Sequence, residues 1–112
     1  MSVRETIERG DFGEIASLLS PDVVWVGLEP GQLCRNRDEV LSVFREALAS
    51  GMTGSLEVVA EEDDLLVIAP HVTPPPERNP DLHQVFVVRE ERIVELRDFR
   101  DRAGALEAVG LS

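Results

Sequence analysis

The chain has 112 residues, of which 43% are hydrophobic and 29% are charged, a composition typical of one globular domain with a single core. All eleven basic residues are arginines, and 22 acidic residues outweigh them to give a net charge of −11. This charge repels nucleic acid and anionic lipid, so we expect neither as a partner. The one cysteine, Cys34, cannot form an intrachain disulfide, and no apolar run is long enough to cross a membrane. We therefore expect a cytoplasmic protein.

The first half of the sequence predicts helices around one strand. A short helix is expected before Gly10, and a second, with apolar residues at helical spacing, is expected to stop at the segment SPD (20–22). The β-branched and aromatic run VVWVGL, residues 23–28, predicts a buried strand. Asn36 and Glu39 have the spacing of a capping box, and the apolar residues that follow predict a third helix.

The second half of the sequence predicts two β-hairpins and a closing helix. Residues 55–72 read as two strands around an acidic turn, and residues 82–99 read as two more around the segment REER. The proline-rich segment 73–80 between them predicts a loop, and residues 102–111 predict a short helix. Helices followed by a strand meander indicate an α+β fold, in which helices pack on one face of a curved sheet.

The last predicted strand ends with a carboxylate where an apolar residue is expected. In the stretch IVELRDFRDR, residues 93–102, the two-residue period of a strand places Asp98 on the same face as Leu96. Counted from the REER turn, regular pairing puts His83 opposite Asp98, on a face that also carries Val85. The sequence therefore predicts a polar pair at the end of an apolar face.

The first hairpin extends this face with a second histidine. Counted from the acidic turn, one of its faces collects Val67 and ends with His71. Trp25, the only tryptophan, alternates with Gly27 on the first strand and either lines a ligand cavity or is part of the core. We expect His71, His83 and Asp98 to line one concave cavity with Trp25.

This cluster has several chemical interpretations. Apolar walls raise the pKa of a carboxyl group and a nearby imidazole lowers it, and these opposed effects suit a group that accepts and returns a proton near neutral pH. An imidazole oriented by Asp98 is an alternative base. His83 and Asp98 are also compatible with a purely structural pair at the mouth of the core, and two histidines with a carboxylate form a possible metal triad.

The opposite sheet face predicts an interface. It carries large apolar residues, including Ile68, Phe86 and Ile93, and the helices of so short a chain are expected to cover only one face. A large exposed apolar patch marks an interaction surface. We therefore expect a homodimer that packs sheet to sheet.

Taken together, the residues resemble a known family. The segments GDFGEIASLLSPDVVWVG, CRNRDEVLSVFREAL and HQVFVVREERIVELRDFRDRAGALEAVGL are similar to the nuclear transport factor 2-like superfamily, and most similar to its SnoaL-like branch. The resemblance covers nearly the whole chain and implies one domain over residues 1–112. It implies a cone, in which a strongly curved, mixed or antiparallel sheet wraps around N-terminal helices and an apolar pocket, with a convex face that dimerises.

The resemblance also implies a range of functions. Relatives include polyketide cyclases, ketosteroid isomerases and limonene epoxide hydrolase, beside ligand-binding proteins without activity. The segment LRDFRD is similar to the last strand of the hydrolase, whose aspartate corresponds to Asp98. The other hydrolase positions hold His71, Thr73, Trp25 and Gly27, so the resemblance carries over at Asp98 alone, and the isomerase tyrosine is absent because the chain has no Tyr.

The expected function is therefore the binding of a small hydrophobic or mixed-polarity molecule in an apolar pocket. The expected chemistry is a proton transfer of the isomerase, cyclase or dehydratase type, with Asp98 and His83 as acid–base groups and His71 polarising the substrate. The binding walls are expected to include Trp25 and a set of apolar strand residues: Val67, Val85 and Leu96. No cofactor and no metal are implied. The alternative is a non-catalytic ligand-binding or dimerisation module of the same fold.

Overall fold

The structure is a computed structural model that describes residues 3–9, 12–73 and 80–111. Its helices are α1 (Val3–Glu8), α2 (Phe12–Leu18), α3 (Arg37–Ala49) and α4 (Arg102–Ala108). Its strands are β1 (Leu19–Val26), β2 (Leu33–Cys34), β3 (Thr53–Glu62), β4 (Leu65–Thr73), β5 (His83–Arg89) and β6 (Arg92–Phe99). The predicted proline-rich loop has its residues 74–79 outside the described part of the chain.

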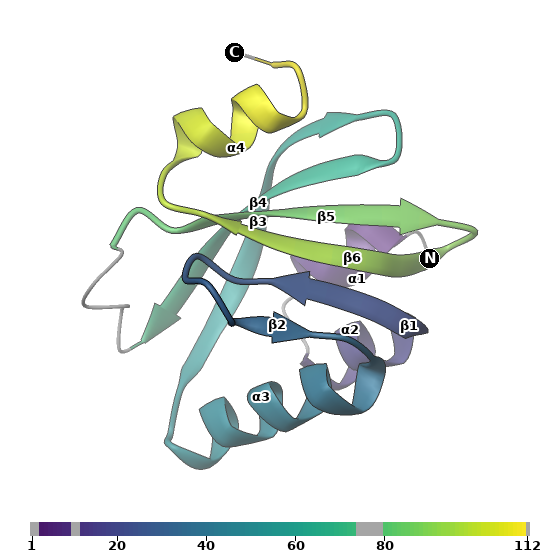
Figure 1. Ribbon diagram of the computed structural model, residues 1–112, viewed down its shortest axis with the longest axis vertical. Helices are drawn as coiled ribbons and strands as arrows, with labels where there is room; N and C mark the ends of the chain where they lie inside the picture. The colour runs from purple at the N-terminus through teal and green to yellow at the C-terminus, as the bar shows by residue number, and fades with distance from the viewer. Residues whose placement is uncertain (1–2, 10–11, 74–79, 112) are drawn as a thin grey trace.

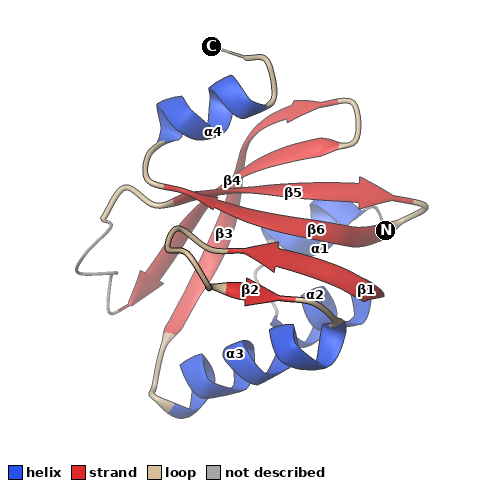
Figure 2. Ribbon diagram, in the orientation of Figure 1, coloured by secondary structure: helices blue, strands red, loops and turns tan. Residues whose placement is uncertain are grey.

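The strands form one curved sheet in the order β2-β1-β6-β5-β4-β3 (Figures 1 and 2). Strand β1 pairs with β6 in parallel, whereas the other neighbours pair antiparallel. Helices α1, α2 and α3 lie on one side of the sheet, and α4 lies on the other, against β4, β5 and β6 (Figure 1). The expected α+β class, with a curved sheet around N-terminal helices, is confirmed.

The helix and strand predictions agree closely with the structure, with two differences, one in β1 and one in β2. Strand β1 begins at Leu19, so the segment SPD lies inside the strand rather than before it. Its pairing with β6 is irregular between Leu19 and Val24, which accommodates Pro21, because proline has no N–H to give to a strand partner. The two-residue strand β2 is too short to leave a pattern in the sequence.

Helix α3 is positioned by the cap that its sequence predicts. The side chain of Asn36 accepts a hydrogen bond from the backbone N–H of Glu39, at 3.0 Å. This bond satisfies one of the free donors at the helix start. Helix α3 carries Val43 and Phe44 towards the sheet, where both border the candidate site.

Each hairpin contains a one-residue irregularity that changes which side chains share a face. In β5 and β6, Val88 pairs with Ile93 but Val87 pairs with Glu95, so Val94 is an extra residue in β6. Such a bulge reverses the face of every residue beyond it relative to regular pairing. His83 therefore faces Phe99, and Gln84 faces Asp98. The predicted pairing of His83 with Asp98 is wrong for this reason.

The first hairpin shows the same effect. Its turn lies at Asp63 and Asp64, whereas the sequence prediction centres the turn on Glu62 and Asp63, and Val59 is an extra residue between the Val58–Ile68 and Ala60–Val67 pairs. Ile68 consequently faces the helices, whereas Val67 faces α4.

The core therefore has two parts, one on each side of the sheet. The larger part lies under α1, α2 and α3 and contains these buried side chains: Ile7, Ile15, Leu19, Val23, Val40, Leu56, Leu66, Ile68, Phe86, Ile93 and Leu96. The smaller part is formed by Val67 and Val85 with Ala105 and Val109, the last two contributed by α4 and its C-terminal end.

The residues expected in a dimer interface lie in the larger core. Ile68 and Ile93 are fully buried and Phe86 is 2% exposed within the single chain. The expectation that these three side chains contact a second subunit is wrong. Its premise fails as well, because α4 covers part of the face that was expected to have no helix.

Candidate functional site

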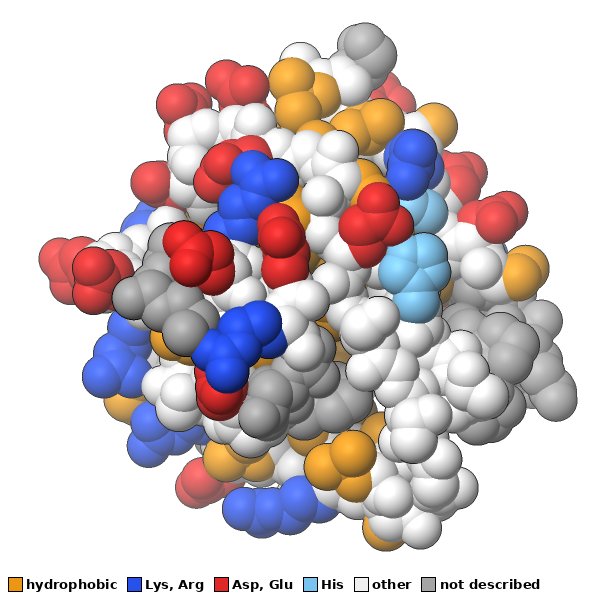
Figure 3. Space-filling model, turned by 180° about the vertical axis from the view of Figure 1, so that it is seen from behind, with side chains coloured by type: hydrophobic (Ala, Val, Ile, Leu, Met, Phe, Trp, Pro, Cys, Tyr) orange, Lys and Arg blue, Asp and Glu red, His pale blue; other side chains and the backbone are white. Residues whose placement is uncertain are grey.

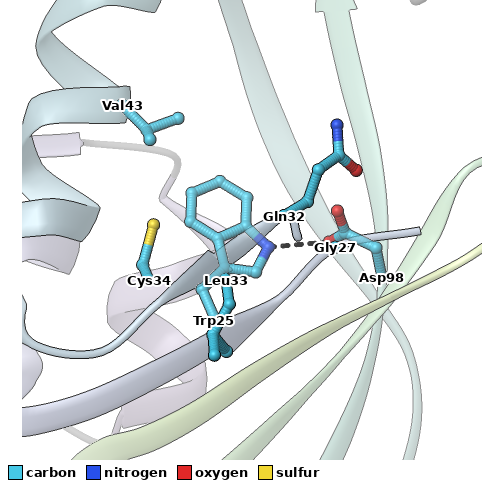
Figure 4. Close-up of a pocket in the computed structure, with 7 residues that line it drawn as sticks. All are labelled: Trp25, Gly27, Gln32, Leu33, Cys34, Val43 and Asp98. Carbon is cyan, nitrogen blue, oxygen red and sulfur yellow. Dashed lines mark hydrogen bonds between the residues drawn. The ribbon is translucent and has the colours of Figure 1, made fainter. Parts of the chain in front are cut away.

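Three neighbouring strands bring Trp25, Gln84 and Asp98 together on the helix side of the sheet. Gln84 of β5 lies directly opposite Asp98 of β6. Trp25 of β1 pairs in register with Leu96, two residues before Asp98 and on the same face. The close-up in Figure 4 shows the indole ring with its N–H directed at the carboxylate of Asp98.

The two donors converge on one oxygen of the carboxylate. Trp25 Nε1 donates to Asp98 Oδ1 at 2.9 Å, and Gln84 Nε2 donates to the same atom at 2.9 Å. Within the described part of the chain, no further donor reaches the carboxylate, so Oδ2 stays available. The arrangement holds the carboxyl group in one orientation with one oxygen free to bind or to exchange a proton.

The environment of Asp98 makes its carboxyl group a weaker acid than that of an exposed aspartate. Burial raises the pKa of Asp98 above its ordinary value, because desolvation penalises the charge. The hydrogen bonds from Gln84 and Trp25 stabilise the carboxylate and offset part of this rise in pKa. Opposed effects of this kind suit a group that takes up and releases a proton.

Two cavities meet at Trp25, each about 260 Å³ in volume. The outer cavity is lined by Trp25, Gly27, Gln32, Leu33, Cys34, Val43 and Asp98 (Figure 4). The inner cavity is lined by Ile15, Trp25, Val43, Phe44, Ala47, Met52, Leu56, Pro70, Val72, Pro80, Leu82, Gln84, Phe86 and Leu96. Trp25 and Val43 border both cavities, so a ligand that enters either one contacts the indole ring.

The described lining of the inner cavity is almost entirely apolar. Among the described residues, Gln84 is the only one in this lining with a polar side chain other than Trp25, and the Trp25 N–H already donates to Asp98. The Trp25 ring is itself fixed by an edge-on contact with Phe44, at a centroid distance of 5.8 Å. A mostly apolar pocket with few oriented polar groups is the usual form of a small-molecule site.

The outer cavity contains a second titratable side chain. Cys34 lies on β2, and burial, together with the charges of Glu39 and Asp98, raises the pKa of its thiol. The thiol therefore stays protonated at neutral pH, and Asp98 is left as the acid–base group of this site. Gly27 allows the β1–β2 connection to close, since a Cβ at this position would lie 2.5 Å from the Cβ of Gln32.

The two histidines lie on the other face of the sheet. His71 Nε2 lies 2.8 Å from Glu57 Oε1 in an exposed pair, and His83 Nδ1 lies 2.6 Å from the backbone oxygen of Asp81. Both line a depression beside α4, and Figure 3 shows the two pale blue rings next to each other. The expectation that His71, His83 and Asp98 share one cavity is wrong.

The structure thus divides the set of residues expected at the site. It brings together Asp98, Trp25 and Leu96, and it places Val67 and Val85 with the histidines on the α4 side. A metal triad of both histidines with Asp98 is also excluded by this geometry, and no other group of metal-ligating side chains occurs among the described residues. No described helix is both long and apolar enough to cross a membrane.

Gln84 is the site residue that the sequence interpretation missed. In the sequence, Gln84 is a polar residue on the same strand face as the apolar Leu82 and Phe86, and a polar residue on an apolar face is also the signal that marks Asp98. With the bulge at Val94, these two interruptions become cross-strand neighbours. A bulge leaves no reliable mark in a sequence, so the pairing could not be read from periodicity.

Comparison of the structure with solved structures identifies the fold. An NTF2-like protein of unknown function from Burkholderia pseudomallei superposes with a TM-score of 0.62 at 19% identity, covering 97% of this chain and 92% of that one. A protein from Sinorhizobium meliloti, provisionally named a polyketide cyclase, has a TM-score of 0.62 at 16% identity and covers 86% and 88% of the two chains. A SnoaL-like protein from Mesorhizobium loti with a similar provisional name has a TM-score of 0.63 at 15% identity and covers 87% and 92%. The molecule therefore has the NTF2-like fold.

The sequence itself assigns the chain to a family within this fold. The family model of the SnoaL-like domain matches residues 2–96, so this protein belongs to the SnoaL-like domain family. The resemblance stated from the sequence is confirmed. No curated protein matches the sequence.

Proposed function

We propose that this protein binds a small, mainly apolar molecule across the two cavities at Trp25 and transfers a proton to and from it at Asp98. The observation that carries the proposal is the carboxylate itself, with Oδ1 held by two N–H donors and Oδ2 free at a cavity wall. The names of two structural neighbours, provisionally polyketide cyclases, support this class of chemistry.

One carboxylate is sufficient for the simplest reaction of this class. In an isomerisation, Asp98 Oδ2 removes a proton from a carbon between a carbonyl group and a C=C double bond, the electrons move to form a dienolate, and the same oxygen returns the proton to the far carbon of that double bond. His83 and His71 take no part in this proposal because they lie on the other face.

The test uses an enolisable probe, 1-indanone, in deuterium oxide. Asp98 should accelerate deuterium incorporation at the carbon next to the carbonyl group, followed by NMR, and Asp98→Asn should abolish the acceleration. Cys34→Ser is the matched control, since Cys34 borders the same cavity without acting as the base. Equal exchange rates for the wild type and Asp98→Asn would refute a proton-transfer role.

The alternative function is ligand binding without catalysis, and one observation favours it. Among the described side chains that line the two cavities, Asp98 and Cys34 alone are titratable, and a raised thiol pKa keeps Cys34 neutral. Asp98 therefore has no partner acid or base within the described lining. Probe binding that quenches Trp25 fluorescence, with no catalysed exchange, would establish this alternative.

We also propose that the chain forms a homodimer through the convex sheet face beside α4. The interface differs from the one expected from the sequence, which contained Ile68, Phe86 and Ile93. Leu65 and Val87 pair on the convex face across β4 and β5 and are only half-buried. Analytical ultracentrifugation at micromolar concentration should show a dimer that Val87→Arg dissociates, because the change puts an unpaired charge in the interface. A monomeric wild type would contradict this assembly.

A further inference from the structure

The inner cavity contains an acceptor without a donor. Gln84 is 8% exposed, and its side-chain N–H group is committed to Asp98 Oδ1. No described group donates to its carbonyl oxygen, Oε1. Among the described residues, His83 Nε2 is the one fully buried side-chain nitrogen or oxygen without a hydrogen-bond partner. Gln84 Oε1, which also has no partner, is therefore not fully buried. The oxygen therefore borders open space, and the space that Gln84 lines is the apolar cavity.

The orientation of this amide group is fixed by chemistry. An ionised carboxylate only accepts hydrogen bonds, so Gln84 must present its nitrogen to Asp98 and turn its oxygen away. The same oxygen of Asp98 also receives the Trp25 N–H, and this second bond holds the carboxylate in place. Asp98 and Trp25 thus act together to keep Gln84 Oε1 directed towards the cavity.

We infer that Gln84 determines ligand specificity, and that the ligand is an apolar molecule with a hydrogen-bond donor, a hydroxyl group in particular, that binds Gln84 Oε1. The inference rests on the proposed function and specifies the class of molecule that the site takes. The other described walls of the inner cavity offer hydrocarbon, sulfur and aromatic surface, so the ligand body is apolar.

The physical basis of this selectivity is the cost of an unpaired acceptor. An apolar ligand that fills the cavity removes water from Gln84 Oε1 and leaves the oxygen without a partner, whereas a hydroxyl group replaces the lost bond. Sites of this construction reject analogues that lack the hydrogen-bonding group. Gln84 contacts Asp98 through Nε2 and would contact the ligand through Oε1. The bound hydroxyl group would therefore be separated from the carboxylate only by the amide group of Gln84.

The test compares three probes of nearly equal shape: indane, 2-indanol and 2-methoxyindane. The alcohol can donate a hydrogen bond, the ether can only accept one, and the hydrocarbon can do neither. Binding is followed by the fluorescence of Trp25, the only tryptophan of a chain without tyrosine, and by calorimetry. The wild type should bind 2-indanol roughly tenfold or more tightly than either of the other probes.

Two variants assign the preference to an atom. Gln84→Met keeps the length and removes the acceptor, so it should bind all three probes with similar affinity. Asp98→Asn should keep the preference for the alcohol, because an Asn oxygen can still accept from Trp25 and Gln84. Loss of the preference in Asp98→Asn but not in Gln84→Met would overturn the inference and assign the hydroxyl group to Asp98.

The remaining outcomes separate this inference from the proposed function. Equal binding of the three probes to the wild type would overturn the role of Gln84 and leave the small-molecule site intact. No binding of any probe at its solubility limit would count against both. Catalysed deuterium exchange into 1-indanone is independent of the alcohol preference, so it can succeed where the Gln84 inference fails.

Discussion

At the scale of single residues, Asp98 is the side chain with the most definite chemistry. Its carboxyl group is held by two N–H donors and has a raised pKa through burial. The folded protein therefore binds the Asp98 proton more tightly than the unfolded chain does. The free energy of unfolding consequently falls as the pH rises from the pKa of the unfolded chain to the raised pKa of the folded protein.

Asp98→Asn should escape this loss of stability. The amide cannot ionise, and its oxygen can accept the bonds from Trp25 and Gln84, so the variant should melt at an equal or higher temperature than the wild type at neutral pH. The difference in melting temperature between the variant and the wild type should shrink as the pH is lowered below the pKa of Asp98 in the unfolded chain. Thermal melts of both proteins across the acidic range measure the difference. A variant that melts clearly lower at pH 7 would show that the charge stabilises the fold.

At the scale of elements, the turn between β5 and β6 stores backbone strain. Glu90 and Glu91 have φ angles of 51° and 64°, in the left-handed region that favours glycine and asparagine. Two consecutive residues of positive φ are the requirement of a type I′ turn, for which Asn-Gly is the preferred sequence. The segment REER therefore forms a tight turn without the residues that usually announce one.

Replacing this turn should stabilise the protein. The double change Glu90→Asn and Glu91→Gly should raise the free energy of unfolding by about 1 kcal/mol, since it relieves the strain at both positions. Urea denaturation gives the value. The control, Glu90→Gln with Glu91→Gln, removes the charges but keeps the strained backbone and should not produce this gain. A similar gain in the control would assign the effect to charge.

The cap of α3 links helix stability to the site. Asn36→Ala removes the bond to the Glu39 N–H and should cost about 1 kcal/mol in the free energy of unfolding. Asn36→Ser is the matched control, because serine supplies another capping oxygen and should retain most of the stability. Urea denaturation of the three proteins measures this. Equal losses in both variants would show that the cap bond contributes nothing.

Comparison of these elements shows how far the sequence determines the structure. Capping residues, apolar periodicity and β-branched runs predicted the helices, the main strands and the α+β class, because each is a local property. The site depends on the registers of two hairpins, and an extra residue in each, Val59 and Val94, changes them. Asp98, Trp25 and Leu96 were predicted together, whereas His83 was placed opposite Asp98 in the position that Gln84 occupies.

At the scale of the whole molecule, the register of β5 and β6 determines on which side of the sheet each side chain of β5 lies. The neighbouring residues Phe86 and Val87 provide a test of this register. Phe86 is 2% exposed in the larger core, and Val87 points to the convex face. Phe86→Arg should destabilise the fold by at least roughly 3–5 kcal/mol, because it replaces a buried aromatic ring with an unpaired charge in the core. Val87→Arg should cost less than Phe86→Arg, because Val87 is only half-buried within the chain. Far-UV circular dichroism and urea denaturation distinguish the two, and the reverse ranking would contradict the register.

The parallel pairing of β1 with β6 has a consequence for how the chain folds. The hairpins β3–β4 and β5–β6 are local in sequence, whereas the Trp25–Asp98 bond joins residues 73 positions apart. Contacts between distant segments carry the larger loop-closure entropy and form later. We expect β1 to dock last and to open first, so its amides should exchange with deuterated solvent faster than those of β5 in the native protein. Amides of β1 among the slowest to exchange would contradict this order. If the order is as expected, the Trp25–Asp98–Gln84 constellation is assembled only in the final step of folding, and partly folded chains have no site.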